Sequence, residues 1–320
     1  MSDSLGRHSI CANGPKDVWF DMTYEQAPQS KRSEYLLLRR LKTPTKSPWM
    51  LLLPVFALYA LVLVYPLAWL LFRSFVTDAG FGVENYAQVF DTSVFASVVY
   101  RSFVIALIVS ATCVLVGYPL AYVIHHAPPR IRVIMTTAVV SPVLVGALIR
   151  SFAWIAILEN QGIVNASLVM AGVIEDPVQL VYNRIGLLIG MVNVMLPFCV
   201  LPMVAGMKAI DARLLSAAKS LGASPIRGFL RVFLPLSIQG VSAGALLTFL
   251  LSLGFYITPA LLGGRKDAMI AQIIQVQVMN LGEFNIAAAM GWLLMVVTIV
   301  LLLAYGRFFN LNSLFGSQAR

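Results

Sequence analysis

Apolar and polar residues alternate along this chain in long blocks, and the apolar blocks are about as long as a membrane is thick. A helix needs roughly 20 apolar residues to cross a hydrocarbon core of about 30 Å. Six runs approach or exceed this length: Trp49–Phe72, Ser102–Ile124, Val133–Ile149, Ile185–Met207, Leu234–Tyr256 and Ile286–Tyr305. The pattern predicts an all-α integral membrane protein with six transmembrane helices.

Two of the apolar stretches need interpretation. The third run is short, but it extends through Ser151–Leu158, giving a span at 133–158, if Arg150 faces protein and not lipid. The stretch Ile163–Ile174 has only 12 residues. That length is too short to span a membrane, so we expect an interfacial or re-entrant segment.

The blocks divide the chain into four parts. Residues 1–47 are polar without a sustained apolar period, which predicts a disordered cytoplasmic tail. Residues 48–100 hold the first transmembrane helix and an external loop, and residues 308–320 form a short cytoplasmic tail. The core transmembrane domain is expected at 101–307, with spans near 102–124, 133–158, 185–207, 234–257 and 286–305 and a polar loop at 208–233 between the fourth and fifth spans.

Composition and charge support this topology. Hydrophobic residues make up 59% of the chain and charged residues 12%, against about 45–50% and 25% in soluble domains. Of the 23 Lys and Arg residues, 17 fall before Trp49, in the 125–132 loop, in the 208–233 loop or after Tyr305. The positive-inside rule therefore places both termini and the 208–233 loop in the cytoplasm. No basic patch is interleaved with exposed aromatics, so nucleic-acid binding is set aside.

The sequence lacks the usual patterns of catalytic chemistry. It contains no GxxxxGK[ST] phosphate-binding motif, so we expect no ATPase activity of its own. Apart from Arg150, the predicted spans hold no Asp, Glu, Lys, Arg or His, which disfavours proton- or sodium-coupled transport. The three cysteines are far apart, and the His125-His126 pair has no further metal ligands nearby. We therefore predict no enzyme activity, metal or cofactor.

The longest polar interruption in the second half of the chain is Lys208–Pro235, KAIDARLLSAAKSLGASPIRGFLRVFLP. Asp211 is a good N-cap for a short helix over 212–221. Gly222 is suited to the left-handed conformation that ends a helix. Ser224 and Pro225 begin a second helix, and Pro235 is expected to break it before the next apolar run. The pattern predicts a helix, a glycine turn and a second helix at a membrane surface.

Three interpretations of this stretch compete. The first is an amphipathic connector whose basic residues lie near anionic lipid heads. The second is a docking element in which small residues allow a partner to approach closely. A DNA-binding helix-turn-helix is excluded, because the flanking apolar runs keep the stretch at the membrane and away from a major groove.

The stretch also resembles a known signature. Asp211, Ala217-Ala218, Gly222 and Leu234-Pro235 follow the D-x4-EAA-x3-G-x(~12)-LP pattern of permease subunits in bacterial binding-protein-dependent ABC importers, with Ser216 in place of the family glutamate. The resemblance implies a coupling helix that docks on a cytoplasmic ATP-binding subunit, a second permease subunit, an extracytoplasmic solute-binding protein and an inner-membrane location. The ATPase-coupling residues that it implies are Asp211, Leu214, Ser216, Ala217, Ala218, Gly222 and Pro235.

A narrower resemblance concerns the substrate. SLGFYITPALLGG at 252–264 is similar to the polyamine and opine branch of these permeases. Aromatic faces and carboxylates suit a polycation, and the candidates for the substrate path are Trp154, Glu159 and Tyr256. Two alternatives stay open: a motor-independent channel or facilitator, and a membrane scaffold that transports nothing.

Overall fold

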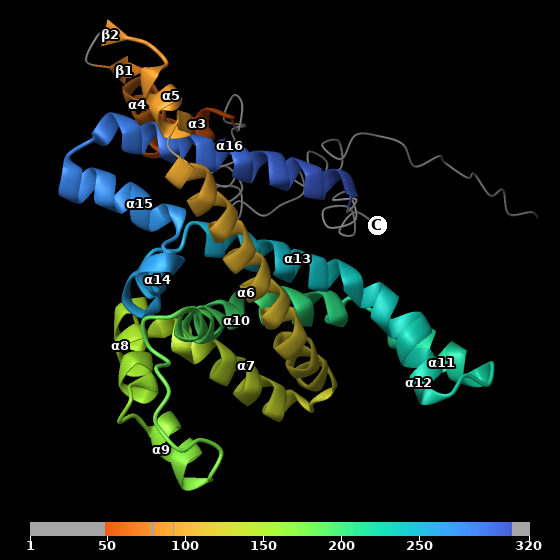
Figure 1. Ribbon diagram of the computed structural model, residues 1–320. Helices are drawn as coiled ribbons and strands as arrows, with labels where there is room; N and C mark the ends of the chain where they lie inside the picture. The colour runs from red at the N-terminus through yellow and green to blue at the C-terminus, as the bar shows by residue number, and fades with distance from the viewer. Residues whose placement is uncertain (1–48, 78–79, 92, 309–320) are drawn as a thin grey trace, which may run out of the picture. The chain divides into compact units, whose positions relative to one another are not determined.

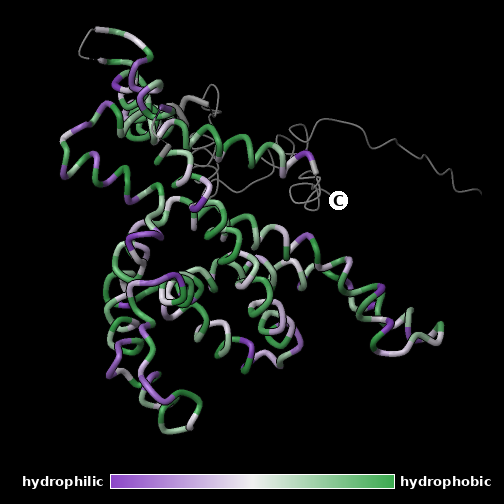
Figure 2. Tube along the Cα trace, in the orientation of Figure 1, coloured by the Kyte–Doolittle hydropathy of each residue, from purple (hydrophilic) through white to green (hydrophobic). Residues whose placement is uncertain are grey.

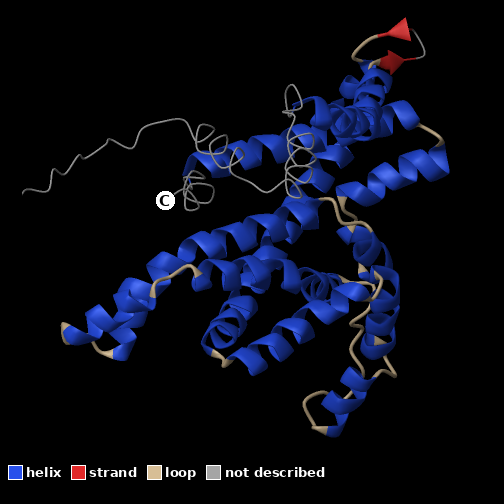
Figure 3. Cartoon of the chain, turned by 180° about the vertical axis from the view of Figure 1, so that it is seen from behind, coloured by secondary structure: helices blue, strands red, loops and turns tan. Residues whose placement is uncertain are grey.

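The computed structural model describes residues 49–77, 80–91 and 93–308, so the predicted tails at 1–47 and at 308–320 beyond Phe308 lie outside the described residues. Figure 3 shows that this part of the chain is almost entirely helical, with one short β-hairpin. Six described stretches are long and apolar enough to cross a membrane: Pro54–Ser74, Val94–His126, Ala147–Met170, Arg184–Lys208, Pro225–Leu253 and Phe284–Arg307. The predicted all-α class and the predicted number of spans are confirmed.

The chain divides into two compact units, Met1–Leu67 and Ala68–Arg320. In the first unit, α3 (Trp49–Tyr59) passes through a π-helical turn, η1 (Ala60–Val64), into α4 (Tyr65–Ser74), which continues into the second unit. The amide of Tyr65 bonds to the carbonyl of Ala60, five residues back. Pro66 follows directly and has no N–H to donate, so the wider turn lets the helix pass the proline without a break.

The second unit begins with a small hairpin and a short helix. β1 (Val76–Thr77) pairs antiparallel with β2 (Gly80–Phe81). The short helix is α5 (Glu84–Asp91). The buried side-chain amide of Asn85 donates to the carbonyls of Ser74 (2.9 Å) and Val76 (2.8 Å), so this amide fixes α5 against the end of α4.

The second and third predicted spans differ from the structure in their extents. Helix α6 runs from Ser93 to His126, so its first turns occupy residues expected in the external loop. The single span predicted at 133–158 is two helices, α7 (Pro129–Leu144) and α8 (Ala147–Leu158). Both Val145 and Gly146 have extended ψ angles, 126° and 143°. The break comes three residues after Pro142, which itself lies inside α7.

Helix α8 leads through a loop into a further short helix. Arg150 in α8 is half-buried, and its Nε and Nη1 atoms are buried, so the condition set for extending the third span through Ser151–Leu158 is met. The stretch predicted to be interfacial contains α9 (Ile163–Met170). Asn165 of α9 is buried and donates to the carbonyls of Glu159 and Val178 at 3.1 and 3.0 Å. This amide closes the loop that follows α8.

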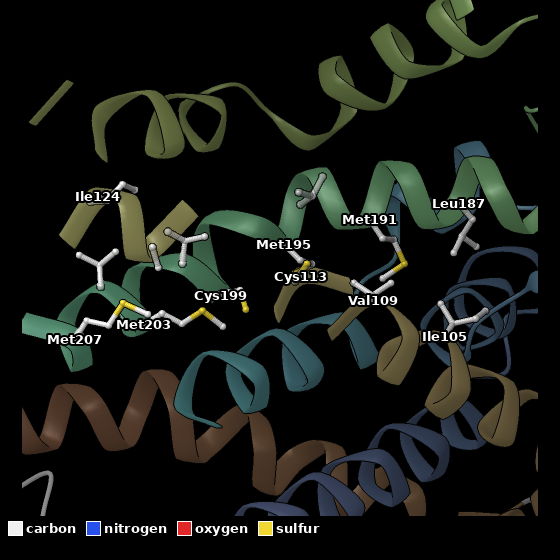
Figure 4. Close-up of a cluster of buried hydrophobic side chains, with 14 of the residues drawn as sticks. Ile105, Val109, Cys113, Ile124, Leu187, Met191, Met195, Cys199, Met203 and Met207 are labelled. Carbon is white, nitrogen blue, oxygen red and sulfur yellow. The ribbon is translucent and has the colours of Figure 1, made fainter. Parts of the chain in front are cut away.

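The core of the second unit is formed by α6, α10 (Arg184–Lys208) and α13 (Leu234–Leu253). Buried residues of α10 recur every four positions, and a matching row on α6 packs against them, as expected when i, i+4 ridges face each other. Figure 4 shows these side chains gathered between the two helices. The rows comprise Leu187, Met191, Met195, Cys199, Met203 and Met207 on α10 and Ile105, Val109, Cys113 and Ala121 on α6.

Helices α10 and α13 approach each other backbone to backbone. A Cβ added at Gly206 would lie 2.6 Å from the Cα of Gly240, and one added at Gly244 would lie 2.5 Å from the carbonyl oxygen of Cys199. Gly240 and Gly244 form a G-x-x-x-G pattern, the arrangement that allows close contact between membrane helices. This contact requires glycine, since any side chain would separate the helices.

The remaining helices follow α13 and include the last span. They are α14 (Ile257–Leu262), the 3-10 helix η3 (Arg265–Asp267), α15 (Ile270–Val276), the π-helical turn η4 (Gln277–Leu281) and α16 (Phe284–Phe308). The buried carboxylate of Asp267 pairs with Arg184 at 3.1 Å. Ser102 of α6 accepts from the amide of Ile270 at 2.9 Å. These contacts join the segment after α14 to the start of α10 and to the third turn of α6.

The close helix contact gives a stability prediction. We expect Gly244→Val to destabilise the protein by about 1–3 kcal/mol, because overpacking forces the backbones apart. Thermal unfolding of the detergent-purified protein measures the change. Gly254→Ala is the control, because an added Cβ there has no heavy atom within 4 Å. Equal melting temperatures for both variants would contradict the assigned contact.

Candidate functional site

The first part of the polar segment after α10, up to the glycine turn, folds as the sequence predicts. The helix expected at 212–221 is present as α11 (Ala212–Ser220). Asp211 adopts an extended conformation (ψ 122°), and its carboxylate accepts from the amide of Arg213 at 2.8 Å. The side chain thus satisfies one of the amides that have no partner within the first turn of a helix.

The glycine turn has the hydrogen bonds of a Schellman motif. Gly222 is in the left-handed region with φ +81°. Its amide donates to the carbonyl of Lys219 at 2.9 Å, and the amide of Ala223 donates to the carbonyl of Ala218 at 3.0 Å. These two bonds satisfy carbonyls at the helix end. Glycine is required here for its backbone conformation, because space around the position is open.

One side of α11 packs against the protein, and most of its other side chains are exposed. Leu215 packs against the core cluster. Leu214 and Ala217 are exposed, and Leu221 at the C-cap is 88% exposed. In Figure 2 the segment around α11 mixes hydrophilic and hydrophobic positions, whereas α16 is largely hydrophobic. The helix therefore presents apolar and small side chains outward on a polar segment.

Two further predicted coupling residues also lie on α11. Ser216 is exposed, and its hydroxyl donates to the carbonyl of Ala212 at 3.3 Å. Ala218 is half-buried. The position where the family pattern has a glutamate thus holds a short side chain bonded to its own helix.

The segment after the glycine turn corrects one prediction. Ser224 caps α12 (Pro225–Gly228), with its hydroxyl 3.4 Å from the amide of Arg227. The expected break at Pro235 is wrong, because helical structure continues from Pro225 to Leu253. A π-helical turn, η2 (Phe229–Phe233), lies directly before α13, and the amide of Leu234 bonds to the carbonyl of Phe229. As at Pro66, the wider turn accommodates the proline.

A groove on the membrane-spanning part of the second unit contains one of the substrate-path candidates. Its volume is about 490 Å³, and Trp154 of α8 and Thr112 of α6 line it together with residues of α10. A second groove, of about 280 Å³, lies between α6, α7 and α10. Asn193 and Leu196 line both, so the two grooves meet along α10.

Asn193 is a residue that the sequence analysis missed. It is half-buried on α10 and is the only polar side chain lining the second groove. An amide within an otherwise apolar span is a signal that the sequence carried. Its helical phase toward the grooves became clear only from the packing of α10.

The other two substrate-path candidates lie elsewhere. Glu159 is exposed at the C-cap of α8, where its backbone carbonyl accepts from Gly162 at 2.7 Å and from Asn165. Tyr256 is 38% exposed at the start of α14. Neither residue lines either of the two grooves. Of the three substrate-path candidates, Trp154 alone lies in one of these grooves.

Comparison with known proteins gives the family. The family described as "Binding-protein-dependent transport system inner membrane component" matches residues 129–311, more than half of the chain. The chain is 34% identical to the spermidine/putrescine transport system permease protein PotB of Salmonella typhimurium over 71% of this chain and 79% of that protein. It is 33% identical to PotB of Escherichia coli over 71% of this chain and 82% of that protein.

Solved structures show the same fold. A bacterial ABC transporter involved in the import of the acidic polysaccharide alginate matches with a TM-score of 0.65 at 18% identity, over 92% of this chain and 99% of that chain. The chain belongs to the family of binding-protein-dependent transport system inner membrane components. It is a multi-pass permease subunit of an ABC importer of the inner membrane.

The cap of α11 gives a second prediction. Asp211→Ala removes the acceptor for the Arg213 amide, which costs a helix about 1 kcal/mol. We expect amide hydrogen exchange over residues 212–215 to become about fivefold faster. Hydrogen-exchange mass spectrometry measures this rate. Ser220→Ala, at the other end of α11, is the control, and an equal acceleration in both variants would contradict the capping role.

Proposed function

We propose that α11 docks on a separate cytoplasmic ATP-binding subunit and transmits its movement to the membrane helices. The observation that carries the proposal is the exposed, capped and glycine-ended helix between the fourth and fifth spans. Its short outward side chains permit close seating, and its Schellman turn fixes its end. The sequence lacks a phosphate-binding motif, so the energy has to come from another subunit.

The orientation follows from charge. The 208–233 loop carries five Lys and Arg residues, which supports a cytoplasmic position by the positive-inside rule. Both termini are proposed on the same side. In this orientation α11 faces the compartment that holds ATP, and the loop after α14 faces the opposite side.

The grooves support a path shared with a second permease subunit. They lie open along α10 and are lined mainly by apolar residues. A second subunit that covered this face would enclose a passage with Trp154 and Asn193 on one wall. Substrate is proposed to arrive from an extracytoplasmic solute-binding protein, as the family's description implies.

The proposed substrate is a polyamine such as spermidine or putrescine. The support is the naming of the PotB relatives, which favours polyamines over opine derivatives. The 252–264 segment that carried the resemblance to this branch folds into α14 and its flanks. There the hydroxyl of buried Thr258 lies 3.1 Å from that of Ser151. That segment therefore packs α14 against α8, and the ring of Trp154 is the group suited to an ammonium.

Transport then proceeds by alternating access. ATP closes the ATPase dimer, the docked α11 helices move with it, and the spans open the path outward. Hydrolysis resets the arrangement. The ATPase and the binding protein each shift the equilibrium only to the extent that they bind one state more tightly than the other.

The turn after α11 provides the functional test. We expect Gly222→Asp to abolish spermidine uptake while leaving membrane insertion intact, because a side chain and a charge at the turn prevent seating on the ATPase. Uptake of labelled spermidine and copurification of the ATPase subunit are measured in cells that lack the native chain. Gly172→Asp is the control, because Gly172 has a similar φ of +69° and open space but lies outside the docking segment.

Three results would contradict the proposal. The first is normal uptake with normal ATPase association in the Gly222→Asp variant. The second is flux through liposomes that contain this chain alone, which would favour a motor-independent channel. The third concerns the substrate only: calorimetry in which the partner binding protein binds an opine but neither spermidine nor putrescine would replace the polyamine.

A further inference from the structure

A cluster of aromatic rings joins the segment after α11 to the cytoplasmic end of α6. Phe229 and Phe233 lie on the π-helical turn η2, and their rings stack with centroids 5.9 Å apart. The rings of α6 pack against them from the other side. We call this group the aromatic cluster: Tyr118, Tyr122, His125, His126, Phe229 and Phe233.

The contacts across the cluster are close and specific. Tyr122 meets both phenylalanines edge to face, with centroids 5.4 Å apart and planes at 89° in each case. Phe233 is only 1% exposed. One turn further along, the hydroxyl of Tyr118 lies 3.1 Å from that of buried Ser237 on α13. The end of α6 is thus held by both rings of η2 and by the start of α13.

The cluster also connects to α11. Leu215 of α11 and Phe229 of η2 both pack against the same core cluster, and α11 contacts both α12 and η2. A displacement of α11 therefore presses directly on the π-helical turn. The turn carries an i→i−5 hydrogen bond before Pro235, and such turns inside α-helices occur often at functional sites.

On the membrane side, α6 leads from the cluster to the grooves. Tyr118 lies six residues after Thr112, about 9 Å along a helix that rises 1.5 Å per residue. Thr112 lines the larger groove, and Leu120 lines the smaller one. Because both are on the same uninterrupted helix as the cluster, movement of the end of α6 moves the groove walls.

We propose that the aromatic cluster is the joint that passes displacement of α11 to α6, so that Phe229 and Tyr122 are positioning residues for transport. The inference rests on the proposed docking of α11. The joint transmits a push because rings in edge-to-face contact cannot approach each other further. Replacing one ring with a smaller side chain leaves a void between η2 and α6, so part of the displacement of α11 is no longer passed to α6. ATP hydrolysis then continues while the groove walls move less.

The test uses the complete transporter in proteoliposomes, with its ATPase, second permease subunit and binding protein loaded with spermidine. Spermidine uptake and ATP hydrolysis are measured together, and their ratio is compared between variants. We expect Phe229→Leu to lower uptake per ATP by at least about fivefold, the lower end of typical couplings between sites. The ATPase subunit still copurifies. Phe229→Tyr retains the ring and restores the ratio.

A ring pair elsewhere on the same helix provides the matched control. Phe103 of α6 meets Phe249 of α13 at 5.8 Å and 64°, and both are half-buried, as Phe229 is. Phe103→Leu therefore creates a similar void without touching the joint, and we expect it to leave uptake per ATP unchanged. If Phe229→Leu fails to assemble, Tyr122→Leu removes the opposing ring and takes its place.

The outcomes separate this inference from the proposed function. A ratio unchanged in the assembled Phe229→Leu complex, or lowered equally by Phe103→Leu, overturns the joint and leaves the docking of α11 intact. An ATPase subunit that fails to copurify with the unaltered chain overturns the proposed function and this inference with it.

Discussion

The arrangement of the second unit depends on the direct backbone contact between α10 and α13. Within a membrane, lipid is as apolar as the side chains, so helices are held together by packing and not by exclusion of water. Gly206 and Gly240 let the two backbones meet, and Gly244 lies against the carbonyl of Cys199. The 208–233 loop begins just after Gly206, and η2 lies two turns before Gly240. The contact therefore sets where both ends of the α11 segment emerge (Figure 1).

Proline and the π-helical turn form a second recurring device. Pro66 and Pro235 each follow the first residue after a π-helical turn, and in both cases an amide bonds five residues back. A proline in a regular helix would meet the carbonyl four residues before it. The wider turn moves that carbonyl, so the helix stays continuous. At Pro235 the continuity matters for the proposed coupling, because a break would separate α11 from α13.

The two grooves along α10 show what the chain contributes to a path and what it lacks. Their walls are mainly apolar, with Thr112, Trp154 and Asn193 as the groups that can meet a polar substrate. A polycation crossing such a surface has an aromatic face and an amide to contact, but these grooves offer it no carboxylate.

The sequence by itself determined the number of spans, the caps at Asp211 and Ser224, and the glycine turn at Gly222. Each of these follows from local rules: the length of an apolar run, a side chain bonding to a nearby amide, and a φ angle that favours glycine. Tertiary structure decided the rest. Helical phase and contacts between distant segments decided the division of the third span between α7 and α8 and the passage of the helix through Pro235. They also decided that Asn193 and Trp154 line one groove and that Glu159 and Tyr256 lie outside it. Hydropathy is nearly uniform around these spans, so it carries little information about which face of a helix meets which neighbour.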